Sequence, residues 1–332
     1  MSEKDFKALI VEEDSEGNFS RKIATKATSE LPENEALIRV SYSALNYKDA
    51  LSASGNKGVT RKYPHTPGID AAGVVEEDKS GRFKKGEEVI VTSYDLGMNT
   101  SGGFSEYISV PSSWIVPLPD GLTLKESMIQ GTAGFTAGLA LYKMEMCGQN
   151  PMMGPILVTG ASGGVGSMAI AILAKAGYEV IASTGKKEAW DYLKKLGATE
   201  CISREDVDDQ SGKPLLKPKW AGAIDTVGGN TLATAIKACD RNGSVAVCGL
   251  VGSPKLGTTV FPFILNGANL LGIESAECPM EIRLKIWHKL ASSWYVDSMD
   301  EMATYCSLDE LNGYIDQILK GQTKGRVVVD LT

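Results

Sequence analysis

Residues 156–166 read I-L-V-T-G-A-S-G-G-V-G and run directly into S-M-A-I-A-I-L-A-K-A at residues 167–176. An apolar run, a glycine-rich turn and apolar residues at helical spacing predict a strand, a tight turn and a helix. Residues without a β-carbon let the backbone approach a bound pyrophosphate, whose charge is met by free amides and the helix dipole. This context predicts a dinucleotide site; the alternative is a plain turn between packed elements. The residues assigned to the site are Gly163, Gly164 and Gly166, with backbone amides from Ser162 and Val165.

The pattern on either side of this turn predicts the fold class. Residues 125–275 alternate apolar strand segments with helical periods, which is typical of β-α-β units on a doubly wound parallel sheet. The strands expected there are residues 156–159, 179–183, 222–225, 244–248 and 269–272. Before about residue 120, short β segments broken by Gly and Pro favour a small β-barrel domain; they include residues 36–42, 72–76 and 88–92. A last β segment at residues 325–331 follows a helix, so we expect it to return to this first domain.

The end of the second predicted strand, Y-E-V-I-A-S-T-G-K-K at residues 178–187, decides between NADH and NADPH. An acidic residue there would accept bonds from the ribose hydroxyls and repel a 2'-phosphate, and none is present. Hydroxyls, amides and positive charge suit a phosphate dianion instead. The residues predicted to bind it are Ser183, Thr184, Gly185, Lys186 and Lys187. Arg204, in I-S-R-E at residues 202–205, follows a further presumed strand before residue 222 and could reach the same pocket. The sequence therefore favours NADPH; the alternative is that the two lysines only solvate a helix start.

Composition sets limits on partners and compartment. The chain has 332 residues, a net charge of −7, 43% hydrophobic and 23% charged residues, values typical of a globular protein of about two domains. We expect no nucleic-acid partner, because no basic stripe could neutralise a run of phosphates. No stretch resembles a signal peptide or a membrane span, so we expect a cytoplasmic protein. The six cysteines lack any C-x-x-C pair and are expected to be buried free thiols: Cys147, Cys201, Cys239, Cys248, Cys278 and Cys306.

A catalytic metal is not expected from the residues available. The chain has two histidines, His65 and His288, and no cysteine before Cys147. Neither histidine belongs to a cluster with metal-ligand spacing, so a zinc site would lack ligands. His65, in Y-P-H-T-P-G, is expected to be an ordinary loop histidine rather than an acid or base.

Several motifs together resemble a known family. The chain is similar to the medium-chain dehydrogenase/reductase superfamily, in its zinc-independent quinone oxidoreductase branch and, within that, the NADPH-dependent acryloyl-CoA reductase group. The matching motifs span nearly the whole chain: S-A-L-N-Y-K-D-A-L from residue 43, P-G-I-D-A-A-G from 67, G-T-A-G-F-T-A from 131, G-A-S-G-G-V-G from 160, A-G-A-I-D-T-V-G-G from 221 and P-F-I-L from 262. Zinc alcohol dehydrogenases of the superfamily carry Gly-His-Glu where this chain reads Gly68, Ile69, Asp70. Some relatives carry Arg where this chain has Ser183 followed by lysines.

The resemblance implies a fold, a cofactor and a set of cofactor contacts. It implies a GroES-like β-barrel domain at residues 1–125, completed by residues 300–332, and a Rossmann NADP-binding domain at residues 126–299. The active cleft would lie between them, and relatives commonly pair as homodimers through the Rossmann domain. Positions that contact NADP(H) in the group match Tyr47, Ser162, Gly163, Gly164, Val165, Thr184, Gly185, Lys186, Arg204, Leu250, Ile264, Ser275 and Arg326, and Thr132 lies beside the nicotinamide in the wider superfamily.

The resemblance also implies reduction of a small activated alkene, such as acryloyl-CoA to propionyl-CoA, without metal. Hydride would reach the β-carbon while donors around the carbonyl oxygen stabilise the enolate. Tyr47 is a candidate proton donor with Asn46 and Asp49 positioning groups around it; the alternatives are that Tyr47 packs on the nicotinamide, that water donates, and that the other two serve turn structure.

The substrate and even the class of function stay open at this point. Lys57, Arg61 and Lys62 are candidates for the phosphates of a CoA ester, although a solvated loop explains them as well. Quinones or small enones and enals are the alternative substrates. A protein that binds NADPH without catalysis is a further alternative, and a nucleotide-sensing regulator has no DNA-binding element in its support.

Overall fold

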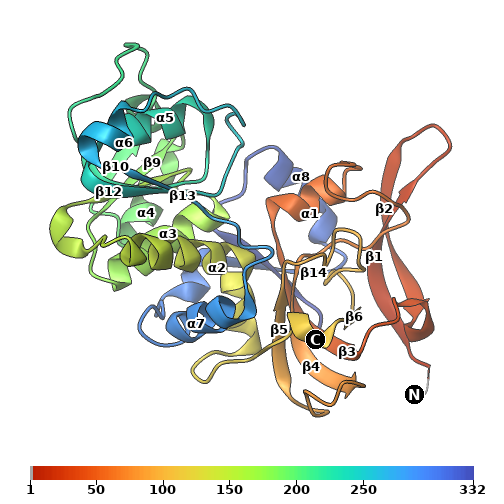
Figure 1. Cartoon of the computed structure of the whole chain (residues 1–332). Helices are drawn as coiled ribbons and strands as arrows, with labels where there is room; N and C mark the ends of the chain where they lie inside the picture. The colour runs from red at the N-terminus through yellow and green to blue at the C-terminus, as the bar shows by residue number, and fades with distance from the viewer. Residues whose placement is uncertain (1–2) are drawn as a thin grey trace. The chain divides into compact units, whose positions relative to one another are not determined.

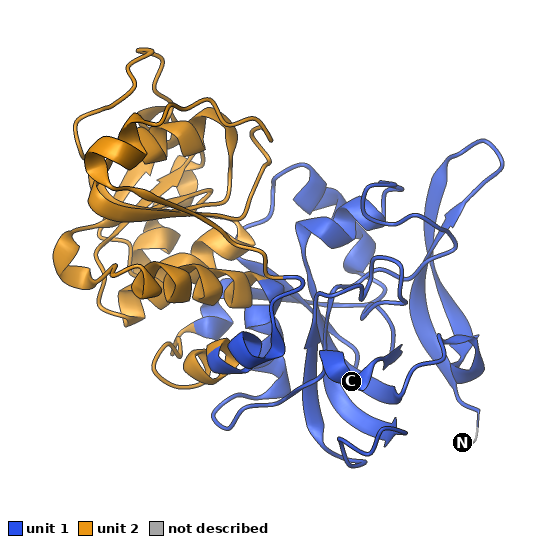
Figure 2. Cartoon of the chain, viewed as in Figure 1, with its two compact units in different colours: residues 1–132, 276–285, 299–332 blue, residues 133–275, 286–298 orange. Residues whose placement is uncertain are grey.

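The computed structural model describes residues 3–332 and divides into two compact units, coloured separately in Figure 2. Unit 1 comprises the described residues up to 132 together with 276–285 and 299–332. Unit 2 comprises residues 133–275 and 286–298. Two helices, α2 (Leu124–Met146) and α7 (Met280–Leu290), each begin in unit 1 and end in unit 2. These units group residues by contact; the domain boundaries expected from the sequence stay a prediction.

Within the described residues, unit 1 is built on a seven-stranded sheet in the order β14-β15-β3-β4-β5-β7, with β6 also paired to β3. Its strands are β3 (Ala36–Leu45), β4 (Asp70–Asp78), β5 (Glu88–Thr92), β6 (Tyr107–Val110), β7 (Val116–Pro117), β14 (Ala303–Ser307) and β15 (Arg326–Asp330). A separate antiparallel hairpin joins β1 (Asp5–Glu13) to β2 (Phe19–Ala27). The helical elements are α1 (Tyr47–Ser52), α8 (Leu311–Leu319), η1 (Thr28–Glu30), η2 (Ser112–Trp114) and η6 (Met299–Met302).

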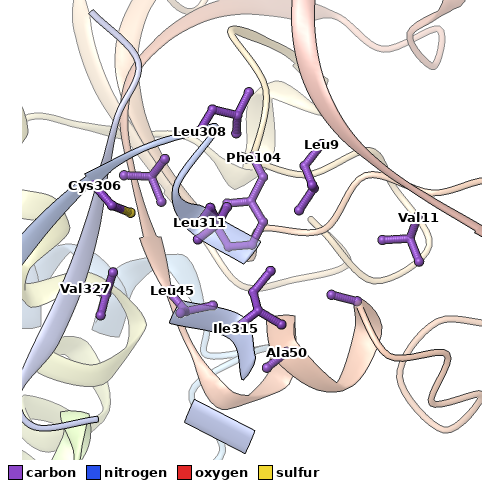
Figure 3. Close-up of a cluster of buried hydrophobic side chains, with 12 residues drawn as sticks. Leu9, Val11, Leu45, Ala50, Phe104, Cys306, Leu308, Leu311, Ile315 and Val327 are labelled. Carbon is purple, nitrogen blue, oxygen red and sulfur yellow. The ribbon is translucent and has the colours of Figure 1, made fainter. Parts of the chain in front are cut away.

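A hydrophobic core in unit 1 joins segments that are far apart in the sequence. Figure 3 shows Leu9 from β1, Phe104, Leu311 from α8 and Val327 from β15 among its members. Phe104 and Leu311 are fully buried, and each contributes about 1.5–3 kcal/mol relative to an exposed side chain. Since β15 reads R-V-V-V-D, its β-branched residues suit a strand buried on both faces. This core therefore holds β15 in the seven-stranded sheet of unit 1.

Unit 2 is a six-stranded, all-parallel sheet in the order β10-β9-β8-β11-β12-β13. The strands are β8 (Ile156–Thr159), β9 (Val180–Thr184), β10 (Glu200–Ser203), β11 (Trp220–Asp225), β12 (Cys239–Val247) and β13 (Asn269–Gly272). Numbered from β8, this order is 3-2-1-4-5-6, the doubly wound order in which ligands bind at the carboxyl ends where the order reverses. That point lies between β8 and β11.

Helices cover both faces of this sheet, as Figure 1 shows for α3 and α4 on one side and α5 and α6 on the other. They are α3 (Gly164–Lys175), α4 (Trp190–Lys195), α5 (Gly229–Lys237) and α6 (Phe261–Asn266), with the short turns η3 (Pro151–Met153), η4 (Lys187–Ala189) and η5 (Arg204–Val207). Strands buried on both faces read as continuous apolar runs, and β8 is buried at all four positions.

The fold class expected from the sequence is confirmed. Three strands, at residues 88–92, 156–159 and 269–272, have the expected bounds, and the other expected strands differ by a few residues at their ends. The C-terminal strand β15 pairs antiparallel with β3 in unit 1, as expected. The hairpin β1–β2 and strand β14 had no clear sequence signal. Over residues 3–332, no helix combines the length and the apolar character that crossing a membrane requires.

Candidate functional site

The glycine turn after β8 can form only where two side chains are missing. Gly160 has a φ of +59°, a left-handed conformation that L side chains rarely adopt. A β-carbon on Gly166 would lie 2.4 Å from the carbonyl oxygen of Gly160 and 2.8 Å from Ala161 Cα. These are backbone atoms, so they could move aside only if the turn opened. The turn and the start of α3 therefore pack backbone against backbone.

The helix that follows directs its first amides toward the same place. α3 begins at Gly164, with Gly163 as its N-cap. The amide of Ser167 donates to the Gly163 carbonyl at 2.9 Å, so the amides of residues 164–166 precede the first intrahelical hydrogen bond. The hydroxyl of Ser167 donates to the same carbonyl at 2.8 Å and fixes this end of the helix. The arrangement suits an anion, because the helix dipole adds to the free amides.

The end of β9 lies directly beside the glycine turn. The hydroxyl oxygens of Ser162 and Thr184 are 3.2 Å apart, and the amide of Lys186 donates to Thr184 Oγ1 at 3.2 Å. A β-carbon on Gly185 would lie 3.1 Å from Arg204 Cδ, so the Arg204 side chain passes over the Gly185 backbone. The structure therefore brings Ser162, the second strand end and Arg204 together, which is the arrangement proposed for a 2'-phosphate.

Three further predicted contacts lie toward the other half of the same sheet. Leu250 follows β12 and is 65% exposed, and its Cα lies 3.1 Å from where a β-carbon on Gly228 would be. Ile264, on α6, is 67% exposed. Ser275 follows β13, and its hydroxyl accepts a hydrogen bond from Thr136 Oγ1 at 2.9 Å. Leu250 and Ser275 thus follow carboxyl strand ends, on the sheet edge where the glycine turn follows β8.

A buried carboxylate joins the two loops at the point where the strand order reverses. Asp225, at the end of β11, accepts the hydroxyl of Thr159 at 2.7 Å and the amide of Gly228 at 2.7 Å. Burial raises the pKa of Asp225, and these donors oppose that shift. Thr159 is the residue before the glycine turn, so Asp225 fixes where that turn starts. The sequence analysis did not single out Asp225; its place in A-I-D-T-V-G-G, between an apolar run and two glycines, was the available signal.

In unit 1, three further predicted residues, Asn46, Thr132 and Arg326, converge on a second buried carboxylate, Asp70. Its Oδ1 accepts the hydroxyl of Thr132 at 2.6 Å, and its Oδ2 accepts the Thr132 amide at 2.9 Å and Asn46 Nδ2 at 2.8 Å. The Arg326 guanidinium lies 3.8 Å from Oδ2 and also donates to Asn46 Oδ1 at 3.2 Å. Asp70 is fully buried and Arg326 is 3% exposed. Burial raises the pKa of Asp70, while Arg326 and then Thr132 lower it.

Gly131, inside α2, makes room for this ion pair. A β-carbon there would lie 2.5 Å from Asp70 Oδ2 and 2.9 Å from Arg326 Nη2, and its φ is +49°. This conformation interrupts the helix, so the amide of Thr132 points at the carboxylate instead of into the helix. The motif G-T-A-G-F-T-A therefore has a physical role at its first two positions.

Asp49 is a neighbouring carboxylate with a structural role. It accepts the amides of Asn46 at 2.7 Å and Ile69 at 2.8 Å, and so joins the start of α1 to the segment before β4. Burial, and after it the charge of Asp70, raises the pKa of Asp49 to about 7. The turn chemistry expected for Asn46 and Asp49 agrees with these bonds.

Two residues that the sequence analysis did not identify support Thr132. The hydroxyls of Ser93 and Thr132 are 2.9 Å apart, and Ser93 has a φ of +63°, rare for a residue with a side chain. Arg283 fixes this turn by donating to Thr92 O at 3.1 Å and Ala276 O at 2.9 Å. No local pattern marks Ser93, because its strain and its partner both come from distant segments.

The other candidates in unit 1 are more exposed. Tyr47, the first residue of α1, is 44% exposed. Lys57 pairs with Glu13 and lies over the rings of Phe19 and Tyr63, so its charge already has a partner. Arg61 and Lys62 are exposed. Of the three cations considered for CoA phosphates, Lys57 is thus the one whose position the structure explains otherwise.

His65 is buried, and desolvation lowers the pKa of its imidazole. Its backbone pairs with Val11 in both directions, at 2.8 and 2.9 Å. Across residues 3–332, no group of three or more His, Cys, Asp or Glu side chains is placed to hold a metal ion.

Two family models match the chain. "Alcohol dehydrogenase GroES-like domain" matches residues 32–120, and "Zinc-binding dehydrogenase" matches residues 164–290. Among curated relatives, the chain is 48% identical to the putative quinone oxidoreductase YhfP of Bacillus subtilis (strain 168), over 98% of this chain and 99% of that one. It is 45% identical to the acrylyl-CoA reductase AcuI of Ruegeria pomeroyi, with the same coverage of both chains.

Solved structures give the same picture of similarity. The crystal structure of Bacillus subtilis yhfP with NAD bound superposes with a TM-score of 0.97 at 47% identity, covering 99% of this chain and all of that one. The yhdH oxidoreductase of Salmonella enterica in complex with NADP superposes with a TM-score of 0.95 at 40% identity, covering 98% of this chain and all of that one.

Proposed function

The chain belongs to the medium-chain dehydrogenase/reductase family, in the group of quinone oxidoreductases and acrylyl-CoA reductases, and we propose that it is an NADPH-dependent reductase of a small activated alkene. Acryloyl-CoA, reduced to propionyl-CoA, is the substrate we put first. The observation that carries this choice is the 45% identity to an acrylyl-CoA reductase over 98% of this chain. The chain is an oxidoreductase with either substrate that its relatives' names suggest, a quinone or acryloyl-CoA.

The residues of unit 2 fit an NADPH cofactor. Close backbone packing that requires glycine at position 166 sets the start of α3, where helix amides precede the first intrahelical hydrogen bond. Hydroxyls and cations, not carboxylates, occupy residues 183–187, and Arg204 lies against them. The two structural relatives were solved with NAD and with NADP, so the preference for NADPH rests on these side chains. We propose as the cofactor-binding set the positions that the family resemblance implies: Tyr47, Thr132, Ser162, Gly163, Gly164, Val165, Thr184, Gly185, Lys186, Arg204, Leu250, Ile264, Ser275 and Arg326.

When bound, the dihydronicotinamide supplies the hydride for the β-carbon of the substrate. The chain's own residues hold the cofactor and orient the groups around it. Amides at the glycine turn bind the pyrophosphate, and Thr184, Lys186 and Arg204 bind the 2'-phosphate. Asp70 fixes the orientation of Thr132 and of Asn46 through three hydrogen bonds. Because Asn46 is committed to Asp70 and Arg326, we propose that it positions the start of α1 and transfers no proton.

Tyr47 is the residue that we propose as proton donor. Tyr47 is 44% exposed and is the first residue of α1, directly after Asn46. The Tyr47→Phe variant is expected to lower kcat by about 10²-fold, the low end for loss of a general acid, because the ring stays and the proton is lost. The dissociation constant for NADPH should change less than about twofold, since phenylalanine fills the same space. Stopped-flow turnover together with NADPH fluorescence titration would measure both; unchanged turnover would assign the proton to water.

A quinone or small enone is the second candidate substrate, favoured by the 48% identity to a putative quinone oxidoreductase. The test is an initial-rate comparison of acryloyl-CoA, a simple quinone and a short enal, each with NADPH and with NADH. The proposal expects the highest kcat/KM for acryloyl-CoA with NADPH. Faster quinone turnover would select the second candidate, and NADPH binding without turnover of any substrate would favour a non-catalytic binding protein.

We propose a homodimer formed through β13. Within residues 3–332 this strand is one edge of the six-stranded sheet and pairs with β12, and an edge strand with exposed apolar neighbours suits pairing with a second copy. Leu270, on β13, is exposed, and the exposed apolar side chains in and just before the preceding helix α6 include Val260, Phe261 and Leu265. Light scattering should give the mass of two chains. Leu270→Lys should give the mass of one chain, because pairing of the two strands would remove the new charge from water. Leu284→Lys, on α7, is the control; a Leu270→Lys dimer would contradict the proposal.

The cytoplasm is the compartment that we propose. All six cysteines are free in the structure, which suits a reducing environment. Cys239, Cys278 and Cys306 are buried as expected, but the expectation of burial is wrong for Cys147, which is exposed, and for Cys201 and Cys248, which are half-buried.

A further inference from the structure

Arg204 passes over Gly185 at the end of β9, where we propose that the 2'-phosphate binds. It follows β10 at the start of η5, and its Cδ and Nε lie 3.1 and 3.3 Å from where a β-carbon on Gly185 would be. Register places Ser203 opposite Thr184 in the parallel pair β9–β10. Gly185 therefore leaves space for the guanidinium beside the strand end, and 76% of the Arg204 side chain stays exposed. A ligand phosphate can reach it from solvent.

A carboxylate shares this guanidinium. Glu205 Oε1 lies 3.2 Å from Arg204 Nε in an ion pair between adjacent residues. Its own backbone N–H, then Ser203, then Arg204 lower the pKa of Glu205, so it is ionised at neutral pH. The position of Glu205 is thus set by the first turn of η5 and not by Arg204 alone. The proposed phosphate subsite therefore contains a negatively charged side chain, Glu205.

We propose that Glu205 is a specificity-determining residue that weakens the grip of Arg204 on the 2'-phosphate and so reduces the preference for NADPH over NADH. The inference rests on the proposed function, because it takes Arg204 as a cofactor contact. NADH has hydroxyls where NADPH has the dianion, so Glu205 penalises one cofactor and leaves the other nearly unaffected.

The size of the effect follows from exposure and screening. Exposed ion pairs are weak, so the bond of Arg204 to Glu205 yields to a phosphate, but the phosphate has to displace it. Displacing an exposed ion pair of this kind lowers the affinity of the guanidinium for the phosphate by a factor of about three to five at low ionic strength. Salt of about 0.5 M should reduce the factor to below about two.

The experiment titrates the full chain with NADPH and with NADH by nucleotide fluorescence, without substrate. Glu205→Gln keeps the side-chain shape and removes the charge. The ratio of the NADH to the NADPH dissociation constant is expected to rise about three- to fivefold at low salt, mainly through tighter NADPH. In an Arg204→Ala background the gain should fall below about twofold, because Glu205 then has no guanidinium to share.

Glu179→Gln is the matched control. It removes one negative charge from an exposed residue just before β9, at the opposite end of the strand from Thr184, about 17 Å away along five strand residues. Its NADPH affinity should match the wild type. Unchanged or weaker NADPH binding in Glu205→Gln, an equal gain for NADH, or a gain that persists without Arg204 would each overturn the inference.

The two proposals fail separately. If the ratio changes as expected but no alkene, quinone or enal is reduced, the proposed reaction fails and the role of Glu205 stands. If the chain reduces alkenes with NADPH but the ratio is insensitive to Glu205, the inference fails alone.

Discussion

Asp70→Ala is expected to destabilise the protein by about 3–5 kcal/mol, the range found when one partner of a buried ion pair is removed. Arg326, 3% exposed, would keep its charge without the facing carboxylate. The hydroxyl and amide of Thr132 and the amide nitrogen of Asn46 would lose their shared acceptor as well. Unsatisfied buried donors add to the loss, since each has left water without a replacement partner. Urea unfolding followed by circular dichroism would measure the change in free energy.

Two further variants separate the charge from the packing. Asp70→Asn in combination with Arg326→Met removes both charges and should lose less than the sum of the single changes, because no charge is left buried alone. Glu281→Ala removes a carboxylate from an exposed pair with Lys285 and should change stability little. A loss below about 1 kcal/mol in Asp70→Ala would show that the Asp70 network does not hold unit 1 together.

Gly166→Ala is expected to abolish measurable NADPH binding, a loss of at least about 10²-fold. The new methyl group would lie 2.4 Å from the Gly160 carbonyl oxygen, closer than β-carbons are found, and only backbone motion could relieve the contact. Opening the turn would displace the first amides of α3, and a displacement of about 1 Å is enough to lose about 10²-fold where a bound geometry is tightly held. NADPH fluorescence titration gives the affinity, and a thermal melt should show a lower Tm.

Gly163→Ala is the matched variant in the same turn. Its β-carbon would meet one atom, the Gly160 carbonyl oxygen, at 3.3 Å, and its φ is −80°, so a small shift of the turn accommodates it. Its Tm should fall much less than that of Gly166→Ala, and most of any loss of affinity would come from the ligand side of the turn. Equal binding and Tm in Gly166→Ala and the wild type would contradict the role given to the turn.

The glycine turn of unit 2 and the elements on either side of it could be predicted from the sequence. β8, the glycine turn and α3 are adjacent in sequence, so a strand, a missing β-carbon and a helical period are all visible in one stretch. The residues next to the turn could also be predicted, because parallel strands place their carboxyl ends along one edge of the sheet. Thr184 and Arg204 lie there for that reason.

The Asp70 network could not be found in this way. It joins residues 46, 70, 132 and 326, and nothing in their separate surroundings records that they meet. A carboxylate among Ile69, Ala71 and Ala72 was a hint that it is buried, but burial alone does not name a partner. The same holds for Ser93, whose unusual backbone depends on Arg283, nearly two hundred residues away.

The pairing of β15 with β3 also sets an order of events in the cell. The ribosome delivers β3, β4 and Asp70 early, all of unit 2 next, and residues 326–330 last. The seven-stranded sheet of unit 1 therefore lacks β15 while the parallel sheet of unit 2 is already fully translated. During this time Asp70 also lacks the guanidinium of Arg326. Domains generally fold as they emerge, yet here the first-made sheet is the last to be completed.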